Sequence, residues 1–405
     1  MPDGFKLDAE PAALSDVAGF KTGVAACGLK TSGPDVAVIL NKGDVGAAVF
    51  TQNEVAAAPV RLSRPRAKAA KVRAIVANAG NANCCTGEQG MRDAEEMARI
   101  AASKLGVPED EVLVASTGVI GRALDMAKIR SGIEAATADA KAGGKGDVAG
   151  AILTTDLARK AVSASGTLGG KPFRVAGVAK GSGMIAPNMA TMLAFIVTDA
   201  DASREYLSEL IPHIADRTFN RVTVDGDTST NDMLCVLASG KGKSAPVSSQ
   251  FAEEGQILSE AIEAVAMELA LAIARDGEGA TKLVEVRVSG AATDGDADLA
   301  ARTIAESPLV KTAIHGGDPN WGRILAAAGR SGAKVDDSCA TVRLGGVAVF
   351  EKGAPVLPVP RAATEKLAAK EALVELDLGI GTGEAVMRTC DLTKGYIDIN
   401  AHYHT

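Results

Sequence analysis

The sequence predicts an α/β protein in which layered mixed sheets are covered by helices. Strand-like apolar runs alternate with helix-length amphipathic segments along the 405 residues, and this alternation is typical of layered α/β folds. Hydrophobic residues make up 47% of the chain but aromatic residues only 3%, so the core has to be built from Ala, Val, Ile and Leu. Glycine occurs 44 times, above the usual share of about 7%, which predicts many tight turns.

In the first half of the chain, β-rich runs bounded by turn residues predict short strands and one hairpin. The expected strands are at 37–41, 47–51, 73–78 and 111–116, with a hairpin at 161–166 and 173–179. Helices are expected up to about 105, starting from a capping box of Thr86 and Gln89, and at 125–141. The basic segment 61–73 is interpreted as a solvated connection.

In the second half, the apolar run 191–197 predicts a buried strand that follows a loop. Helices are then expected at 203–217, 251–275, 322–331 and 361–373. Strands are expected at 233–239, 282–288, 340–350, 375–379 and 396–400. The segment 240–250 is the best candidate for a linker, and it predicts a boundary before a smaller C-terminal lobe.

Charge and hydropathy exclude several classes of protein. The net charge is −7, with 43 basic and 50 acidic residues, and no basic cluster of the kind that nucleic-acid binding requires. No apolar stretch approaches the roughly 18 residues of a membrane span, and the N-terminus has no signal-peptide pattern. We therefore expect a cytoplasmic protein with neither nucleic-acid nor membrane partners. The six cysteines are scattered without a C-x-x-C pair, which favours reduced thiols.

The sequence predicts neither a metal site nor a bound cofactor. Asp225, Asp227 and Asp232 lie close together, but their spacing does not match a calcium-binding loop. We interpret this segment as a hydrogen-bonded turn beside the active site. The Gly- and Asn-rich segment after the strand at 73–78 matches neither the P-loop nor the dinucleotide fingerprint.

The junction between Ala190 and Thr191 suits self-cleavage of the chain. A loop containing Gly181, Gly183 and Pro187 leads there into the apolar run. Attack of the Thr191 hydroxyl on the Ala190 carbonyl would give an ester that water opens. The new N-terminus would combine a nucleophile with an amine of pKa about 7.7–8.0, which can accept the hydroxyl proton. On the pattern alone, an ordinary strand residue is the favoured interpretation of Thr191.

Seven motifs together carry a resemblance that covers essentially the whole chain. They are N-A-G-N-A-N at 78–83, S-T-G-V-I-G at 116–121, T-T-D at 154–156, G-M-I-A-P-N-M-A-T-M-L-A-F-I-x-T-D at 183–199, N-R-x-T-V-D-G-D-T-S-T-N-D at 220–232, G-x-D-P-N-W-G-R-I at 316–324 and I-N-A at 399–401. In this order they resemble the ornithine acetyltransferase family, the self-cleaving glutamate N-acetyltransferases of arginine biosynthesis.

The resemblance implies a role for each matching residue. Thr191 is the nucleophile, exposed by cleavage after Ala190, while Thr117 and Gly118 form the oxyanion hole. One such oxyanion donor typically stabilises a transition state by ~2.7–4 kcal/mol. A Thr hydroxyl and a backbone N–H at the end of a strand can supply these donors.

Substrate contacts are likewise implied by the resemblance. Thr154, Lys180 and Thr191 match residues that contact the amino-acid substrate, and Glu278 matches the carboxylate that receives the ornithine ammonium. Two further contacts match at the C-terminus, Asn400 and Thr405. The ending I-N-A-H-Y-H-T departs from the family pattern at His402 and His404, which makes the match of Thr405 the less secure of the two.

The resemblance implies acetyl transfer from N2-acetyl-L-ornithine to L-glutamate through acetyl-Thr191, with ping-pong kinetics. No cofactor is needed, and the use of acetyl-CoA as a second acetyl donor stays open. The implied fold is the self-cleaving DmpA/ornithine acetyltransferase-like fold. An alpha chain of residues 1–190 and a beta chain of residues 191–405 would stay together in a tetramer of two copies each.

Two alternatives are compatible with the same residues. Water in place of glutamate as the acceptor would give a self-cleaving amidohydrolase or aminopeptidase. An uncleaved α/β protein that only binds amino acids would need no nucleophile at all.

Overall fold

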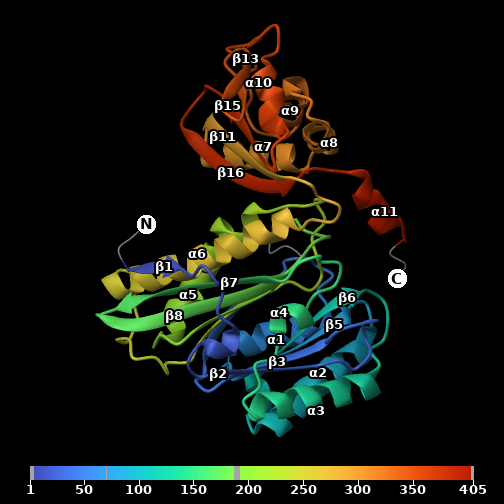
Figure 1. The fold of residues 1–405 in the computed structure, drawn as a ribbon, viewed down its shortest axis with the longest axis vertical. Helices are drawn as coiled ribbons and strands as arrows, with labels where there is room; N and C mark the ends of the chain where they lie inside the picture. Colours follow the sequence, from blue (N-terminus) through green and yellow to red (C-terminus); the bar gives the residue numbers. More distant parts are fainter. Residues whose placement is uncertain (1–3, 70, 187–191, 403–405) are drawn as a thin grey trace.

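The computed structural model describes residues 4–69, 71–186 and 192–402 (Figure 1). Within these ranges the chain forms two facing sheets with helices outside them, and a smaller C-terminal lobe with a sheet of its own. This arrangement confirms the predicted α/β class, the layered mixed sheets and the smaller C-terminal lobe. None of the helices in these ranges combines the length and apolar composition that crossing a bilayer requires.

The first sheet carries the two most deeply buried strands. In spatial order it contains β1 (Phe5–Leu7), β7 (Lys160–Leu168), β8 (Lys171–Lys180), β9 (Leu193–Thr198), β10 (Met233–Ala238) and β4 (Val45–Phe50). Only β9 and β10 run parallel to each other, and every residue of both strands is buried. Helices α5 (Arg204–Arg217) and α6 (Glu253–Arg275) cover one face of this sheet.

The second sheet packs against the other face of the first. It contains β2 (Phe20–Ala25), β3 (Val36–Asn41), β5 (Ala74–Asn81) and β6 (Val112–Val119), in that order. Alternate residues fill the space between the sheets, such as Ile39 and Ile75 opposite Phe195. Helices α2 (Gly87–Leu105) and α3 (Met126–Lys141) cover the outer face. The body therefore has four layers, with two sheets between two layers of helices.

The C-terminal lobe has a separate hydrophobic core. Its sheet contains β14 (Ala354–Pro355), β13 (Val347–Glu351), β12 (Thr341–Leu344), β15 (Glu371–Asp377), β11 (Leu283–Ala291) and β16 (Gly383–Cys390), in that order. The helices of this lobe are α7 (Asp294–Glu306), α8 (Pro308–Gly316), α9 (Trp321–Gly329) and α10 (Arg361–Leu367). A final helix, α11 (Lys394–His402), leaves the lobe and returns beside the body (Figure 1).

Several expected elements differ from the structure. The segment 61–73 is mostly helix α1 (Ala58–Ala69), because its basic residues alternate with apolar ones that bury one face. The expected strand 396–400 is part of α11, and the expected helix 361–373 ends at Leu367 before β15 begins. The expected strand 340–350 is a hairpin of β12 and β13 that turns at Gly345 and Gly346, both with positive φ.

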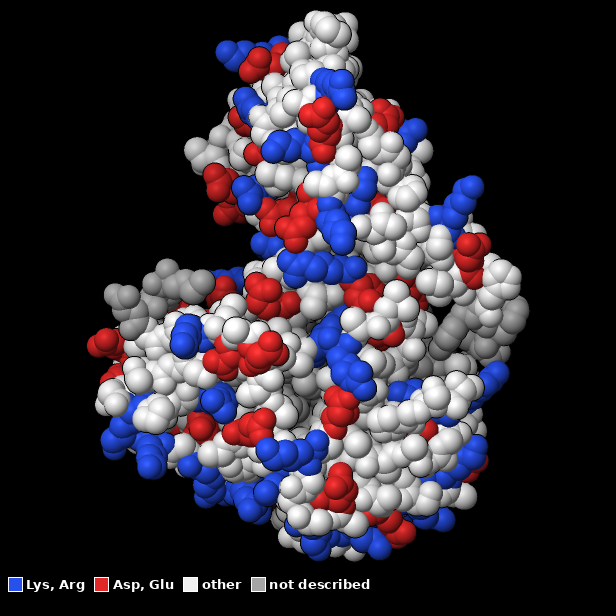
Figure 2. Space-filling model, viewed as in Figure 1, with Lys and Arg blue, Asp and Glu red and all other residues white. Residues whose placement is uncertain are grey.

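Two further segments bear on the predicted boundaries. The segment 240–250 connects β10 to α6, and the sheet of the C-terminal lobe begins at Leu283. Thr86 lies at the N-cap of α2, but its hydroxyl donates to Asn83 Oδ1 at 2.7 Å and makes no capping bond. On the face shown in Figure 2, acidic and basic side chains are interspersed.

Candidate active site

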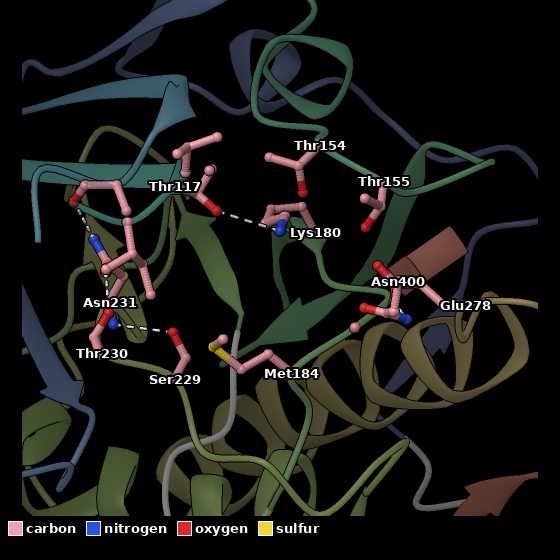
Figure 3. Close-up of a pocket in the computed structure, with 15 residues that line it drawn as sticks. Thr117, Thr154, Thr155, Lys180, Met184, Ser229, Thr230, Asn231, Glu278 and Asn400 are labelled. Carbon is pink, nitrogen blue, oxygen red and sulfur yellow. Dashed lines mark hydrogen bonds between the residues drawn. The ribbon is translucent and has the colours of Figure 1, made fainter. Parts of the chain in front are cut away.

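A cavity of about 200 Å³ lies where the ends of β6 and β8 meet several loops and helix α11 (Figure 3). Its lining combines hydroxyls, one lysine, one carboxylate and two amides, together with small apolar groups. The lining residues are Ala82, Thr117, Gly118, Val119, Ile120, Thr154, Thr155, Lys180, Gly183, Met184, Ser229, Thr230, Asn231, Glu278 and Asn400.

This lining includes six of the residues predicted from the sequence, namely Thr117, Gly118, Thr154, Lys180, Glu278 and Asn400. The other predicted residues, Ala190, Thr191 and Thr405, lie outside the described residues. The cavity thus brings together predicted residues that are up to 283 positions apart along the chain, counted from Thr117 to Asn400.

Thr117 and Gly118 lie near the end of β6, which pairs with β5. Thr117 is buried, and its hydroxyl accepts a hydrogen bond from Lys180 Nζ at 3.3 Å. Gly118 has φ +127°, and a Cβ added there would lie 2.4 Å from the Gly80 carbonyl carbon. The close approach of β5 therefore restricts this position to glycine, which leaves backbone exposed to the cavity.

Lys180 is the last residue of β8 and is only 3% exposed. Burial lowers the pKa of its ammonium, and the nearby carboxylate of Asp156 opposes that shift. Lys180 Nζ lies 3.9 Å from Asp156 Oδ2. Figure 3 shows the lysine between Thr117 and Thr154, with its amine at the cavity.

Asp156 lies in the loop after a short helix, α4 (Val148–Ala151), and not in the strand-like segment that the sequence suggested. The physical reason is that this loop is folded around its own buried charges. Lys160 Nζ donates to Asp156 Oδ1 at 2.7 Å and to Asp276 Oδ2 at 2.5 Å. Although burial raises the pKa of Asp156, Lys180, Lys160 and hydrogen bonds from the backbone hold it at about 2.

Glu278 and Asn400 approach the cavity together from another side (Figure 3). Asn400 Nδ2 donates to Glu278 Oε2 at 2.8 Å, and the Glu278 backbone N–H donates to the Ser182 carbonyl at 3.0 Å. A Cβ added at Gly183 would lie 2.4 Å from the Glu278 carboxyl carbon. Glycine at position 183, in the loop after β8, thus leaves room for the Glu278 carboxylate. In the sequence, Glu278 was recognisable only as an acidic residue between two glycines.

The turn at 229–231 forms a further wall. Asn231 Nδ2 donates to the carbonyls of Ala82 and Ser116, at 2.7 and 2.9 Å, and Thr230 Oγ1 donates to Asn231 Oδ1 at 2.6 Å. These buried bonds tie the turn to the strand that carries Thr117. Sequence reasoning did not propose Ser229, Thr230 and Asn231 as lining residues, although the motif at 220–232 contains them.

Two carboxylates, the half-buried Asp225 and the buried Asp232, hold the chain on either side of residues 187–191. Asp225 accepts hydrogen bonds from the backbone N–H groups of Met184 and Ile185, at 2.6 and 2.9 Å. Asp232 Oδ1 accepts one from the Met192 N–H at 3.0 Å, and burial raises the Asp232 pKa well above its usual range. Across the described ranges, no group of three or more His, Cys, Asp or Glu residues could hold a metal ion.

The described walls can bind a small molecule with separated charges. Lys180 offers a buried positive charge next to the Thr117 hydroxyl, and Glu278 offers a buried negative charge supported by Asn400. The carboxylate of an amino acid would fit the first and an ammonium group the second. His315, which lacked a partner in the sequence, pairs with Asp391 at 2.8 Å in the C-terminal lobe and does not line this cavity.

Comparison with known proteins gives a consistent result along nearly the whole chain. The model of a family described as the ArgJ family matches residues 21–405. The chain is 48% identical over 392 residues to the arginine biosynthesis bifunctional protein ArgJ of Symbiobacterium thermophilum, covering 96% of this chain and 97% of the relative. It is 46% identical to the protein of the same name from Rhodopirellula baltica, with 95% and 94% covered.

Two solved structures are also similar. One is the arginine biosynthesis bifunctional protein argJ of Bacillus halodurans, with 41% identity, a TM-score of 0.48 and coverage of 50% of this chain and 95% of that one. The other is ornithine acetyltransferase complexed with ornithine from Mycobacterium tuberculosis, with 34% identity, a TM-score of 0.41 and coverage of 45% and 98%.

Proposed function

This chain belongs to the ArgJ family, and we propose that it is an acetyltransferase of arginine biosynthesis that moves acetyl from N2-acetyl-L-ornithine to L-glutamate. The single observation that supports the specific reaction is that a lysine and a carboxylate line different parts of one small cavity. Lys180 and Thr117 lie at one part of its lining, and Glu278 and Asn400 at another. Acetylornithine and glutamate share the carboxylate of an amino acid, so one cavity can serve both.

The proposed chemistry has two acyl transfers. The Thr191 hydroxyl attacks the acetyl carbonyl of acetylornithine, and its proton passes to the Thr191 α-amino group. The C–N bond then breaks as that ammonium gives the proton to the leaving nitrogen, and ornithine is released with acetyl-Thr191 left behind. The glutamate amine then attacks acetyl-Thr191, its proton passes through the Thr191 α-amino group to the Thr191 oxygen, and the ester C–O bond breaks, which gives acetylglutamate and restores the hydroxyl. In both steps the Thr117 hydroxyl and the Gly118 N–H would stabilise the negative carbonyl oxygen, typically by ~2.7–4 kcal/mol for each donor.

The Thr191 α-amino group requires prior cleavage after Ala190, and we propose that the chain performs this step itself. The proposal includes an alpha chain of 1–190 and a beta chain of 191–405, assembled as two copies of each in the cytoplasm. It also includes a Thr405 substrate contact, and no cofactor. Acetyl-CoA as a second donor would add amino-acid N-acetyltransferase to glutamate N-acetyltransferase activity, in agreement with the word "bifunctional" in the names of the relatives.

Family membership favours this transferase over the two alternatives, a hydrolase that uses water as the acceptor and a non-catalytic amino-acid-binding protein. The decisive test compares the parent chain with Thr191→Ala. We expect the parent to give two fragments by intact mass and a new N-terminus at Thr191 by N-terminal sequencing. It should also form acetylglutamate from acetylornithine, whereas the variant should stay whole and inactive.

Thr167→Ala is a matched control, because Thr167 is an exposed strand residue far along β7 from the cavity. It should behave like the parent in both measurements. Cleavage and full activity of Thr191→Ala would refute the proposal, while release of free acetate without acetylglutamate would support the hydrolase.

A further inference from the structure

We propose that Asp156 is the positioning residue for Lys180: its carboxylate holds the lysine in place and keeps it cationic, so that the cavity retains a positive charge for the substrate carboxylate. This inference rests on the proposed function. Asp156 does not line the cavity, whereas Thr154, Thr155 and Lys180 do. It therefore acts through Lys180 and not by touching substrate.

The contacts of Asp156 place it at the centre of the loop and strand that carry the lysine. Its Oδ1 accepts hydrogen bonds from Lys160 Nζ at 2.7 Å and from the Gly181 N–H at 2.6 Å. Its Oδ2 accepts one from the Thr154 N–H at 3.2 Å. One carboxylate thus fixes the residue that follows Lys180 as well as a predicted substrate contact.

A second carboxylate, Asp276, helps to hold Lys160, the cation that Asp156 binds most closely. Lys160 also binds Asp276 at 2.5 Å, and Asp276 Oδ2 in turn accepts from the N–H groups of Leu157 and Ala158. The strong ion pairs are therefore made with Lys160, which does not line the cavity. Lys180 stays 3.9 Å from Asp156, close enough for a strong electrostatic effect in a buried site.

This arrangement leaves Lys180 available to a ligand. A lysine ammonium has three N–H donors, and within the described residues Lys180 Nζ makes one hydrogen bond, to Thr117 Oγ1. Among residues 4–69, 71–186 and 192–402 no further hydrogen-bond acceptor meets the remaining donors, and the amine borders the cavity (Figure 3). A lysine captured by a direct, short salt bridge would offer less to a substrate.

The charges around Lys180 make Asp156 its most dependable counter-charge. The ammonium form of Lys180 is stabilised by three nearby carboxylates, Asp156, Asp232 and Glu278. It is destabilised by two nearby lysines, Lys160 and Lys30. Burial raises the Asp232 pKa well above its usual range. Glu278 is bound to Asn400. The Asp156 pKa of about 2 keeps that carboxylate ionised throughout the working range.

The sign of the expected effect follows from these charges. Burial lowers the Lys180 pKa, and Asp156 is the first of the groups that raise it again. Removal of the Asp156 charge should therefore make Lys180 lose its proton at a lower pH. Binding of a carboxylate would then fail at alkaline pH while remaining closer to normal in acid.

The test is the pH dependence of the Asp156→Asn variant, measured between about pH 6 and about pH 9.5. In the pH profile of kcat/KM for acetylornithine, we expect the alkaline limb of the variant to lie at least about one pH unit lower than that of the parent. The acid limb should be the same in both proteins. KM should rise roughly tenfold at the alkaline end and much less near pH 6. L-Ornithine binding by calorimetry should show the same alkaline loss without depending on turnover.

Asp147→Asn is the control, because Asp147 is also an aspartate of this region but pairs with the exposed Arg159, and Asn can replace it at the N-cap of α4. It should keep the pH profile of the parent. If Asp156→Asn fails to mature, Lys180→Arg tests the same claim, since guanidinium stays charged at every pH used and the alkaline limb should disappear.

An alkaline limb that is unchanged in Asp156→Asn, or that persists in Lys180→Arg, would overturn the inference. These outcomes are distinct from failure of the proposed function, in which the parent itself would not form acetylglutamate. In that case the calorimetric comparison of ornithine binding still decides whether Asp156 controls Lys180.

Discussion

Two buried lysines, one in the layered body and one in the C-terminal lobe, are held in different ways. The Lys160 side chain is 1% exposed, and its amine lies between the carboxylates of Asp156 and Asp276. Lys311 is 3% exposed, and its amine donates to the Thr389 hydroxyl at 2.7 Å and to the Cys390 carbonyl at 2.6 Å. Within the described ranges no carboxylate lies within ion-pair distance of Lys311.

The different partners of Lys160 and Lys311 indicate where this fold buries paired charges. Burying an ion pair seldom adds stability compared with apolar packing, but breaking one is costly. In the body, the paired charges adjoin Lys180 and the proposed substrate cavity. In the lobe, neutral groups satisfy the lysine at the contact of α8 with β16. We infer that the paired charges serve the cavity and that the neutral contacts serve packing.

The largest effect should come from Lys160→Met. Two buried carboxylates, Asp156 and Asp276, would lose their shared cation, and removal of one partner from a buried pair typically costs ~3–5 kcal/mol. The free energy of unfolding, measured by urea denaturation at neutral pH, should fall by about that amount. A loss below about 1 kcal/mol would mean that the pairing is dispensable and that the comparison with Lys311 has no energetic basis.

The next effect is a loss of stability in acid that depends on Asp156. The folded-state pKa of about 2 lies below the usual 3.8, so its stabilising contribution is complete above about pH 4 and disappears as the pH falls through about 2. Between pH 5 and pH 2, the parent should lose about 2 kcal/mol more unfolding free energy than Asp156→Asn. Equal acid sensitivity of the two proteins would argue against an ionised Asp156 in the fold.

A smaller effect is expected for Lys311→Met. The methionine would fill the space of the apolar stem and relieve the burial of a charge, but the Thr389 hydroxyl and the Cys390 carbonyl would lose a donor. These opposing changes should leave a net cost of about 1 kcal/mol. Thermal and urea unfolding should agree on this value. A cost equal to that of Lys160→Met would erase the distinction between the two sites.

The smallest effect is expected for Arg159→Met, which breaks a pair of this region at the surface. The Arg159 side chain is 66% exposed, and its partner Asp147 is 45% exposed. Exposed pairs typically contribute ~0–1 kcal/mol, so unfolding free energy should change by no more than about 0.5 kcal/mol. A larger change would indicate that proximity to the cavity matters more than burial.

The sequence predicted β3, β5, β9 and β10 well, because each contains an apolar run bounded by turn residues, whereas it predicted no strand at β1 or β2. It failed for α11, which has no buried residue and therefore no apolar stripe. It also misjudged α1, where Arg and Lys on the exposed face obscured the buried Val60, Leu62 and Ala67. The local sequence pattern predicts a helix or strand only when the buried side chains of that element form a clear apolar pattern.

The site was predicted by motif and not by local pattern. The motifs identified Lys180 and Glu278 as members of one site, and the structure places both in one cavity. The sequence analysis did not predict the buried ion pair of Lys160 with Asp276 beside the cavity. These two residues lie 116 positions apart, and only the packed fold brings them together. Nothing in the spacing of a lone lysine or aspartate distinguishes a buried ion pair from two solvated side chains.

The pairing of β8 with β9 has a final consequence for the proposed cut after Ala190. These strands flank the cut, and they pair over six positions, from Val175 with Thr198 to Lys180 with Leu193. Both products would therefore contribute neighbouring strands to one sheet, and neither could leave with its hydrophobic surface covered. Hydrolysis would change the covalent connectivity without releasing either product, and mild dilution should recover an intact complex where denaturant yields two chains.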